Sequence, residues 1–214
     1  MSEYTKEQKQ FFTETYNELL TMIRVDSYEA IGKTFESVLE SALEQGYHID
    51  YAPTKRKLPL LLEALHLSDE AAMYLIDAGA NVNAEDKYQG RSVLIKAIDN
   101  RCAPCVIKKI LDRTSDVNHK DDLGYSALKF FCFRVIHQRM YFIETDKNNF
   151  AVLDMLLKAG ADTSVLDNLE IKNLGKYSAE TERKMREHIA LFKQQQEELS
   201  NNNNCIEQSY DYEL

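Results

Sequence analysis

The residues best suited to chemistry in this sequence are two cysteines separated by two residues, in Cys102-Ala-Pro-Cys105. Pro104 favours the first turn of a helix, so a helix is expected to begin between the two thiols. A helix N-terminus lowers the pKa of a nearby thiol and so favours its nucleophilic thiolate form. One interpretation is therefore a redox or thiol-dependent site, and the other is an ordinary helix start.

The surrounding sequence favours the second interpretation. The C-x-P-C motif resembles the redox motif of thioredoxins, which follows a strand and precedes a long helix. Here the motif is expected to join two short helices, and the chain contains no Trp. The motif is therefore interpreted mainly as structural.

A metal site or a Cys–His pair would need further ligands near Cys105. Cys132 and His137 are five residues apart, which is poor geometry for a hydrogen-bonded pair on one helix, and His119 is not far in sequence. Cys132 stands within the aromatic run 130–133, which is typical of a small buried core residue. We expect no catalytic residue, no cofactor and no metal. A thiol-dependent enzyme or a metal site that uses Cys102, Cys105 and Cys132 remains the alternative.

The composition limits the possible partners. The chain has 214 residues, a net charge of −9, and only seven Gly and three Pro, which favours a helical fold. A negative chain does not suit nucleic acid, whose phosphates need a basic face, and it disfavours an anionic membrane surface. No apolar run of about 18 residues or signal peptide is seen. The four cysteines form no disulfide framework, so we expect a soluble protein of a reducing compartment.

Apolar residues recur at spacings of three and four along most of the chain, which predicts amphipathic helices. The expected helices are residues 3–25, a second helix from about 27 to Gly46, and then 69–78, 106–113, 149–158 and about 179–199, and three further helices are expected to start within 58–64, 90–97 and 124–128.

A repeated pattern organises these helices, and its best copy is Met73–Asp86, MYLIDAGANVNAED. It reads as a helix end, a Gly79 turn and a returning Val82. This stretch resembles the second half of an ankyrin repeat. Leu58-Pro-Leu-Leu-Leu-Glu-Ala64 and Gly90-Arg-Ser-Val-Leu-Ile-Lys-Ala97 resemble the start of the family's inner helix.

The spacing of two markers supports the resemblance. The turn position falls at Gly46, Gly79, Thr114 and Gly160, in steps of 33, 35 and 46 residues, and the inner-helix Leu falls at Leu60, Leu94, Leu128 and Leu174, in steps of 34, 34 and 46. The ankyrin period is about 33 residues. The long step places an insertion near 134–148. At the third turn, Thr114 and Ser115 replace Gly and Ala, which we expect to weaken it.

The resemblance implies an all-α solenoid of ankyrin repeats with helical caps at both ends. Residues 1–57 would form the N-terminal cap and a divergent first repeat, 58–168 three repeats with the insertion, and 169–199 a degenerate capping repeat. We expect residues 200–214 to be disordered, because they contain an Asn run beside an acidic end.

Ankyrin arrays bind proteins through their loops and concave face, so the resemblance implies an unidentified protein partner and a monomeric scaffold. The expected contact residues are Tyr88, Gln89, Arg91, Asp122, Leu123 and Tyr125 on two loops, and Arg134, His137, Arg139 and Tyr141 in the insertion. Exposed Tyr and Arg are typical interface anchors. Tyr88 and Tyr125 have a second interpretation, as covers for neighbouring repeats.

The C-terminal sequence runs from Glu197-Glu198-Leu199 to Tyr210-Asp-Tyr-Glu-Leu214, and its last residues loosely match the apolar-x-apolar carboxyl terminus that some peptide-capturing domains accept. It also resembles the Glu-rich export signal of effectors that intracellular bacteria secrete through type IV systems, many of which carry ankyrin repeats. This resemblance implies a cytoplasmic protein, or one secreted into the cytoplasm of a host cell. A solvated disordered end is the alternative.

Overall fold

A computed structural model describes residues 4–25, 31–54, 57–137, 146–166 and 176–210. The regular structure of these residues is helical, with nine α-helices, one 3-10 helix and no strand. The predicted all-α class is therefore confirmed for the described residues. The single β-bridge among them joins Glu85 and Ser92 within one loop.

The helices come in consecutive pairs. Their bounds are α1 Lys6–Val25 and α2 Ile31–Glu44, α3 Leu60–Leu67 and α4 Asp69–Asp77, α5 Val93–Asp99 and α6 Pro104–Leu111, α7 Ala127–His137 and α8 Asp146–Lys158. The 3-10 helix η1, Thr163–Leu166, and the long α9, Lys176–Tyr210, follow.

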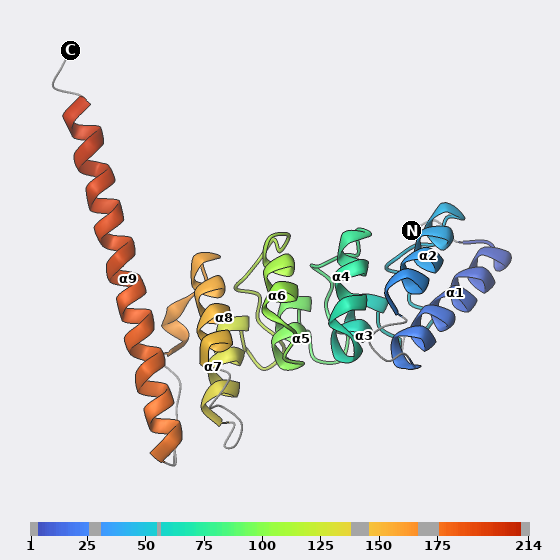
Figure 1. The fold of residues 1–214 in the computed structure, drawn as a ribbon, viewed down its shortest axis with the longest axis horizontal. Coiled ribbons are helices and arrows are strands. Elements are labelled where there is room, and N and C mark those ends of the chain that lie inside the picture. Colours follow the sequence, from blue (N-terminus) through green and yellow to red (C-terminus); the bar gives the residue numbers. More distant parts are fainter. Residues whose placement is uncertain (1–3, 26–30, 55–56, 138–145, 167–175, 211–214) are drawn as a thin grey trace.

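The pairs stand side by side in chain order (Figure 1). Each helix contacts its own partner and also its counterpart in the next pair, so α1, α3, α5 and α7 form one row and α2, α4, α6 and α8 the other. Helix α9 packs against α7 at the far end, and its C-terminal part runs beyond the edge of the stack. Each short pair thus depends on its neighbours to bury its apolar side.

Local sequence explains where the short helices begin and end. Ser68 and Ser92 cap α4 and α5, because their side-chain oxygens accept hydrogen bonds from the backbone N–H groups of Ala71 and Ile95 at 3.2 and 3.3 Å. Pro104 is the first residue of α6, as predicted.

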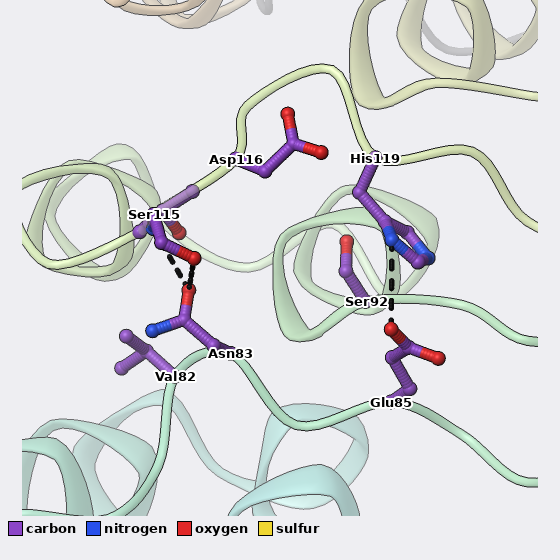
Figure 2. A pocket seen from close by; sticks show the side chains of 8 residues that line it. Val82, Asn83, Glu85, Ser92, Ser115, Asp116 and His119 are labelled. Atoms are coloured by element: carbon purple, nitrogen blue, oxygen red, sulfur yellow. Dashed lines mark hydrogen bonds and ion pairs between the residues drawn. The ribbon is translucent and has the colours of Figure 1, made fainter.

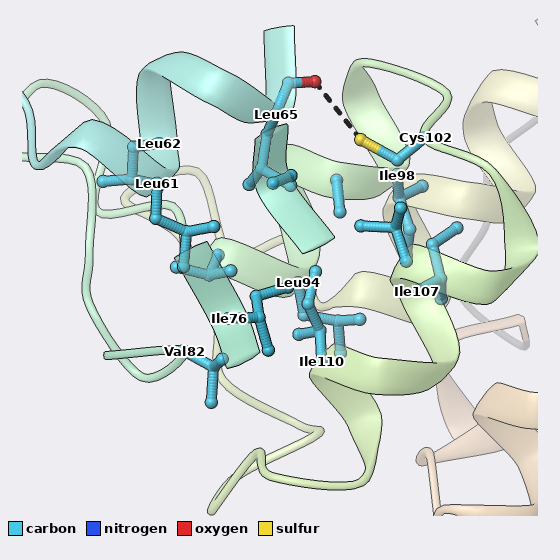
Figure 3. Packing of buried hydrophobic residues seen from close by; sticks show 14 of the residues in the cluster. Leu61, Leu62, Leu65, Ile76, Val82, Leu94, Ile98, Cys102, Ile107 and Ile110 are labelled. Carbon is cyan, nitrogen blue, oxygen red and sulfur yellow. Dashed lines mark hydrogen bonds between the residues drawn. The ribbon is translucent and has the colours of Figure 1, made fainter. Parts of the chain in front are cut away.

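The core runs continuously through the pairs. The three described inner-helix markers, Leu60, Leu94 and Leu128, are at most 1% exposed, which confirms that equivalent positions of successive pairs face the core. Figure 3 shows part of this core, where Leu94 belongs to the same cluster as Ile76 and Ile110. Leu174 lies outside the described residues.

The turn after α6 differs from its counterpart after α4. At Gly79, with φ of 92°, the N–H groups of Gly79 and Ala80 bond back to the carbonyls of Ile76 and Leu75. After α6, the bond equivalent to that of Gly79 runs from Arg113 N–H to the Ile110 carbonyl. No described backbone hydrogen bond is equivalent to that of Ala80. One additional residue therefore lies in this turn, which explains the 35-residue step.

Side-chain hydrogen bonds join the successive turns. The Asp50 side chain accepts from Asn81 N–H at 2.9 Å, Asn83 from Ser115 N–H at 2.8 Å, and Asn118 from Asp162 N–H at 2.7 Å. These acceptors stand at the same place in their loops, four residues after the expected turn positions Gly46, Gly79 and Thr114. The donors Asn81 and Asp162 lie two residues after their turn positions, whereas Ser115 lies only one residue after Thr114. This difference of one residue agrees with the additional residue in the turn after α6.

Two expected boundaries differ. Helix α7 extends to His137 and α8 begins at Asp146, so both ends of the expected insertion 134–148 are helical. Helix α9 continues through the Asn run to Tyr210, beyond the expected end near residue 199, and the segment contains no Gly or Pro that would stop it. Residues 211–214 lie outside the described residues. No helix of the described part is long and apolar enough to cross a membrane.

Candidate functional site

The loop between α4 and α5, residues 85–92, is closed by the buried Asp86. The Asp86 carboxylate accepts a hydrogen bond from Tyr88 N–H at 2.8 Å. Asp86 N–H donates to the Arg91 carbonyl, and Gly90 N–H donates to the Asp86 carbonyl, both at 2.8 Å. An aspartate that binds the backbone N–H two residues on is a typical turn former, so the loop has a defined shape.

The loop between α6 and α7, residues 119–126, is built in the same way around Asp121. The Asp121 carboxylate accepts from Leu123 N–H at 3.0 Å and from Tyr125 N–H at 2.8 Å. Asp121 is 5% exposed and lies 35 residues after Asp86. The two loops therefore present Leu123 and Tyr88 at equivalent positions, each two residues after its buried aspartate.

The two loops are also bonded to each other. Asp122 N–H donates to the Gln89 carbonyl at 3.0 Å. His119 Nε2 lies 2.7 Å from the Gly90 carbonyl oxygen. A carbonyl only accepts, so Nε2 carries the proton in this contact. These bonds join the loops into one unit, which we call the double loop (85–92 and 119–126).

Arg91 belongs to the double loop, and its side chain is largely buried. Its guanidinium forms an ion pair with Asp99 of α5 at 2.8 Å and a longer one with Asp121 at 3.5 Å. The same group stacks 4.8 Å from the centre of the Phe130 ring of α7. Arg134 of α7 pairs with Asp99 from the other side, at 3.2 Å. Through these contacts both arginines connect the α5/α6 pair to the α7/α8 pair.

The large apolar side chains that the double loop exposes are Tyr88 and Leu123, which we call its tips. Tyr88 is 60% exposed and Leu123 is 69% exposed. Gln89 and Asp122 beside them are also exposed. The structure thus brings four of the expected contact residues together on one surface.

The other expected contact residues are placed differently. Tyr125 is partly buried, because its ring packs against Phe130 and Phe133 with centroids 6.2 and 5.8 Å apart. Both rings belong to α7, the helix that directly follows Tyr125, so these contacts are not the cover of a neighbouring repeat that was expected. His137 ends α7, but its side chain lies outside the described residues, as do Arg139 and Tyr141.

A polar pocket lies on the flank of the double loop, between the chain around Asn83 and the chain around Ser115 (Figure 2). Two carboxylates, Glu85 and Asp116, line it. His119 separates them and lies 3.6 Å from Glu85. Glu85, Ser92 and His119 of the double loop contribute to the lining of the pocket, whereas Tyr88 and Leu123 do not.

Three cysteine side chains belong to the described part of the chain, and two of them are buried while one is exposed. Cys102 is buried, and its Sγ donates to the Leu65 carbonyl at 3.2 Å. Burial, with Asp69 nearby, raises the pKa of Cys102 well above its usual range. Burial also raises the pKa of Cys132, to about 12. Cys105 is exposed.

Both buried thiols are therefore neutral at pH 7, which is the opposite of nucleophile activation. Within the described part of the chain, no three His, Cys, Asp or Glu side chains come together as a possible metal site.

The sequence analysis missed the residues that shape the double loop, namely Asp86, Asp99 and Asp121. A signal for two of them was present, because Asp86 and Asp121 are 35 residues apart, the same step as the turn positions Gly79 and Thr114. No comparable repeat marks Asp99, whose role depends on two arginines from different helix pairs.

No protein-family model matches this chain, and no curated protein matches it. The described fold and loops define an all-helical protein of stacked helix pairs with a double loop on one edge.

A matched pair of glycine substitutions tests the contact between the two loops. Gly90 and Gly124 both have positive φ, 61° and 75°. A Cβ on Gly90 would lie 2.6 Å from Asp122 Oδ1, whereas a Cβ on Gly124 would meet nothing within 4 Å. Gly124→Ala should therefore cost only the strain of a left-handed backbone, about 1 kcal/mol. Gly90→Ala should cost about 0.5–1 kcal/mol more, because the Asp122 side chain must leave its rotamer.

Urea unfolding followed by circular dichroism measures both free energies of unfolding. Equal losses for the two variants would show that the Gly90–Asp122 approach does not constrain the double loop.

Proposed function

We propose that this chain is an ankyrin-type repeat protein that binds a partner protein and catalyses no reaction. The observation that carries the proposal is the pair of tips, Tyr88 and Leu123, which are 60% and 69% exposed at equivalent positions of adjacent loops. The stacked helix pairs and their Leu and Gly spacing support the repeat assignment.

A protein ligand suits the tips better than a small molecule does. Tyr88 and Leu123 are exposed and do not line the polar pocket, whereas small-molecule sites are usually concave. Tyr side chains are typical anchors of protein interfaces, and a neighbouring Leu adds apolar area that binding can bury. Both contributions are greatest where the side chains are already held in place. The aspartate-closed turns and the bonds between the loops supply that fixed geometry.

The proposal leaves Arg91 and Arg134 out of the contact surface. Arg91 is 14% exposed, and both arginines are paired with Asp99, so neither side chain reaches a partner without breaking an internal ion pair. Their proposed role is to support the double loop from below. Gln89 and Asp122, which are exposed beside the tips, complete the proposed contact residues.

The competing hypothesis of a thiol-dependent enzyme has less support. An active-site nucleophile needs its thiolate form at neutral pH. Cys102 and Cys132 have raised pKa values, and Cys105 has no neighbouring base among its described hydrogen bonds and ion pairs. The effector setting remains part of the proposal and depends on sequence resemblance alone.

The binding proposal predicts that Tyr88→Ala with Leu123→Ala weakens partner binding about 30-fold. This corresponds to about 2 kcal/mol for two interface anchors. The measurement is affinity capture with quantitative mass spectrometry, followed by titration of the purified candidate partner.

The matched control is Leu191→Ala, because Leu191 is 54% exposed on α9 and lies far along the chain from the double loop. A true partner should bind this variant as it binds the unmodified chain. If every captured protein binds the double variant and the control equally well, the double loop is not the contact surface.

A further inference from the structure

Cys102 and Cys105 lie on either side of the start of α6. Cys102 precedes the N-cap residue Ala103, Pro104 is the first helical residue and Cys105 the second. Two thiols placed just before and within the first turn of a helix have the layout of a C-x-x-C dithiol. Both are free thiols in this structure.

Cys102 lies in the bend between α5 and α6, residues 100–103. Two hydrogen bonds attach this bend to the α3/α4 pair. Cys102 Sγ donates to the Leu65 carbonyl of α3 at 3.2 Å (Figure 3). Ala103 N–H donates to the Asp69 carboxylate of α4 at 2.9 Å. Consequently, a movement of Cys102 away from the core would disturb the contact between two neighbouring pairs.

The same bend contains an unusual backbone conformation. Arg101 has φ of 60°, which no other non-glycine among the described residues shares, and its side chain is exposed. A side-chain-bearing residue costs about 1 kcal/mol in this region. The hydrogen bonds of the two residues that follow it, from Cys102 N–H to the Ala97 carbonyl and from Ala103 N–H to the Asp69 carboxylate, hold the conformation in place.

We propose that Cys102 and Cys105 form a thiol–disulfide switch, in which oxidation withdraws Cys102 from the Leu65 carbonyl and loosens the contact between the α3/α4 and α5/α6 pairs. The exposed Cys105 is the entry point, and the buried Cys102 completes the disulfide. This division of roles makes the pair a target of oxidation, not a catalyst. The switch is independent of the proposed binding function, since neither cysteine lies in the double loop.

The reaction requires a low-molecular-weight disulfide such as glutathione disulfide. The Cys105 thiolate attacks one sulfur, forms a mixed disulfide and releases one glutathione thiolate. When the bend opens, Cys102 loses its proton to water and attacks the Cys105 sulfur, which displaces the second glutathione. Overall, two protein thiols are oxidised to one disulfide and one glutathione disulfide is reduced to two glutathione thiols.

The buried position of Cys102 determines the order and rate of these steps. Burial raises the pKa of Cys102, so its thiolate is scarce while the bend is closed. The mixed disulfide on Cys105 should therefore form first, and closure should follow at the rate of local opening. A disulfide also stabilises a chain by restricting its unfolded state. Global melting temperature is thus a poor readout, and local amide exchange is the appropriate one.

The test treats the full chain with glutathione disulfide and maps its thiols by peptide mass spectrometry. We expect a Cys102–Cys105 disulfide, with Cys132 still reduced because it is fully buried. Hydrogen–deuterium exchange of the oxidised chain should be at least threefold faster in peptides covering 64–70 and 97–106 than in the reduced chain. Reduction with dithiothreitol should restore the original rates.

Two serine variants are the controls. Cys105→Ser removes the exposed thiol and should leave residues 97–106 unresponsive to the oxidant. Cys102→Ser keeps a donor for the Leu65 carbonyl and should stop at the mixed disulfide on Cys105. Two results would overturn the proposal: an unmodified chain that also stops at the mixed disulfide, or a Cys102–Cys105 disulfide that leaves exchange in both peptides unchanged.

Discussion

Replacing Asp121 with alanine is expected to lower the free energy of unfolding by about 3 kcal/mol. The substitution removes the acceptor for the N–H groups of Leu123 and Tyr125 and one of the two carboxylates paired with Arg91. Hydrogen bonds to a charged partner contribute roughly 1.5–3 kcal/mol, and the loss of one member of a buried ion pair about 3–5 kcal/mol. The lower part of that range applies, because Arg91 keeps Asp99.

Urea unfolding of the full chain measures this loss, and two variants show its origin. Asp121→Asn keeps the side-chain oxygen that closes the turn but removes the charge and the ion pair with Arg91, so it should lose about 2 kcal/mol, less than Asp121→Ala. Asp112→Ala removes a carboxylate that is 59% exposed and paired with Lys108, and it should lose less than about 0.5 kcal/mol. If Asp121→Ala is no more destabilising than Asp112→Ala, the buried aspartate does not hold the double loop.

The helical framework was predictable because its signals are local or periodic. Leu60, Leu94 and Leu128 recur at steps of 34 residues, and all three are buried. Ser68 and Pro104 mark helix starts through interactions with their own neighbours in sequence. Such features depend on a few consecutive residues and need no knowledge of how distant segments meet.

The roles of individual loop residues were much less predictable. Tyr88 and Arg91 are three residues apart and were expected to share one binding role. Tyr88 points outward, whereas Arg91 pairs with Asp99 and with Asp121, which is 30 residues further on. A sequence shows that an arginine is present, but its exposure depends on whether the next helix pair supplies a carboxylate and a ring at the right place.

The third turn shows a limit of alignment by pattern. Matching Val117 and Asn118 to the best repeat assigns Thr114 to the glycine position. The hydrogen bond that ends α6 comes instead from Arg113. An alignment that starts from the residues after the turn does not detect an additional residue within the turn. It assigns every residue before the insertion to a position one too far along. Its consequence is the Thr114 hydroxyl, which is buried and has no hydrogen-bond partner among the described residues.

Replacing Leu94 with alanine is expected to lower the free energy of unfolding by about 3–4 kcal/mol. Leu94 is 1% exposed in α5, in the middle of the stack, and belongs to the cluster that includes Ile76 of α4 and Ile110 of α6. Truncation of a buried leucine costs about 2–5 kcal/mol, because the apolar transfer energy is lost and a cavity remains. The upper half of this range is expected, since helices on both sides hold the surrounding side chains in place.

The matched control is Leu123→Ala, the same substitution at a position that is 69% exposed, where a loss below about 0.5 kcal/mol is expected. Both variants are compared by urea unfolding monitored through helical circular dichroism. Because the main contacts of each described helix pair are with the adjacent pairs, Leu94→Ala should also increase amide exchange in α4 and α6 more than in α1. Uniformly faster exchange from α1 to α8 would show that the chain unfolds as one cooperative unit instead of as coupled pairs.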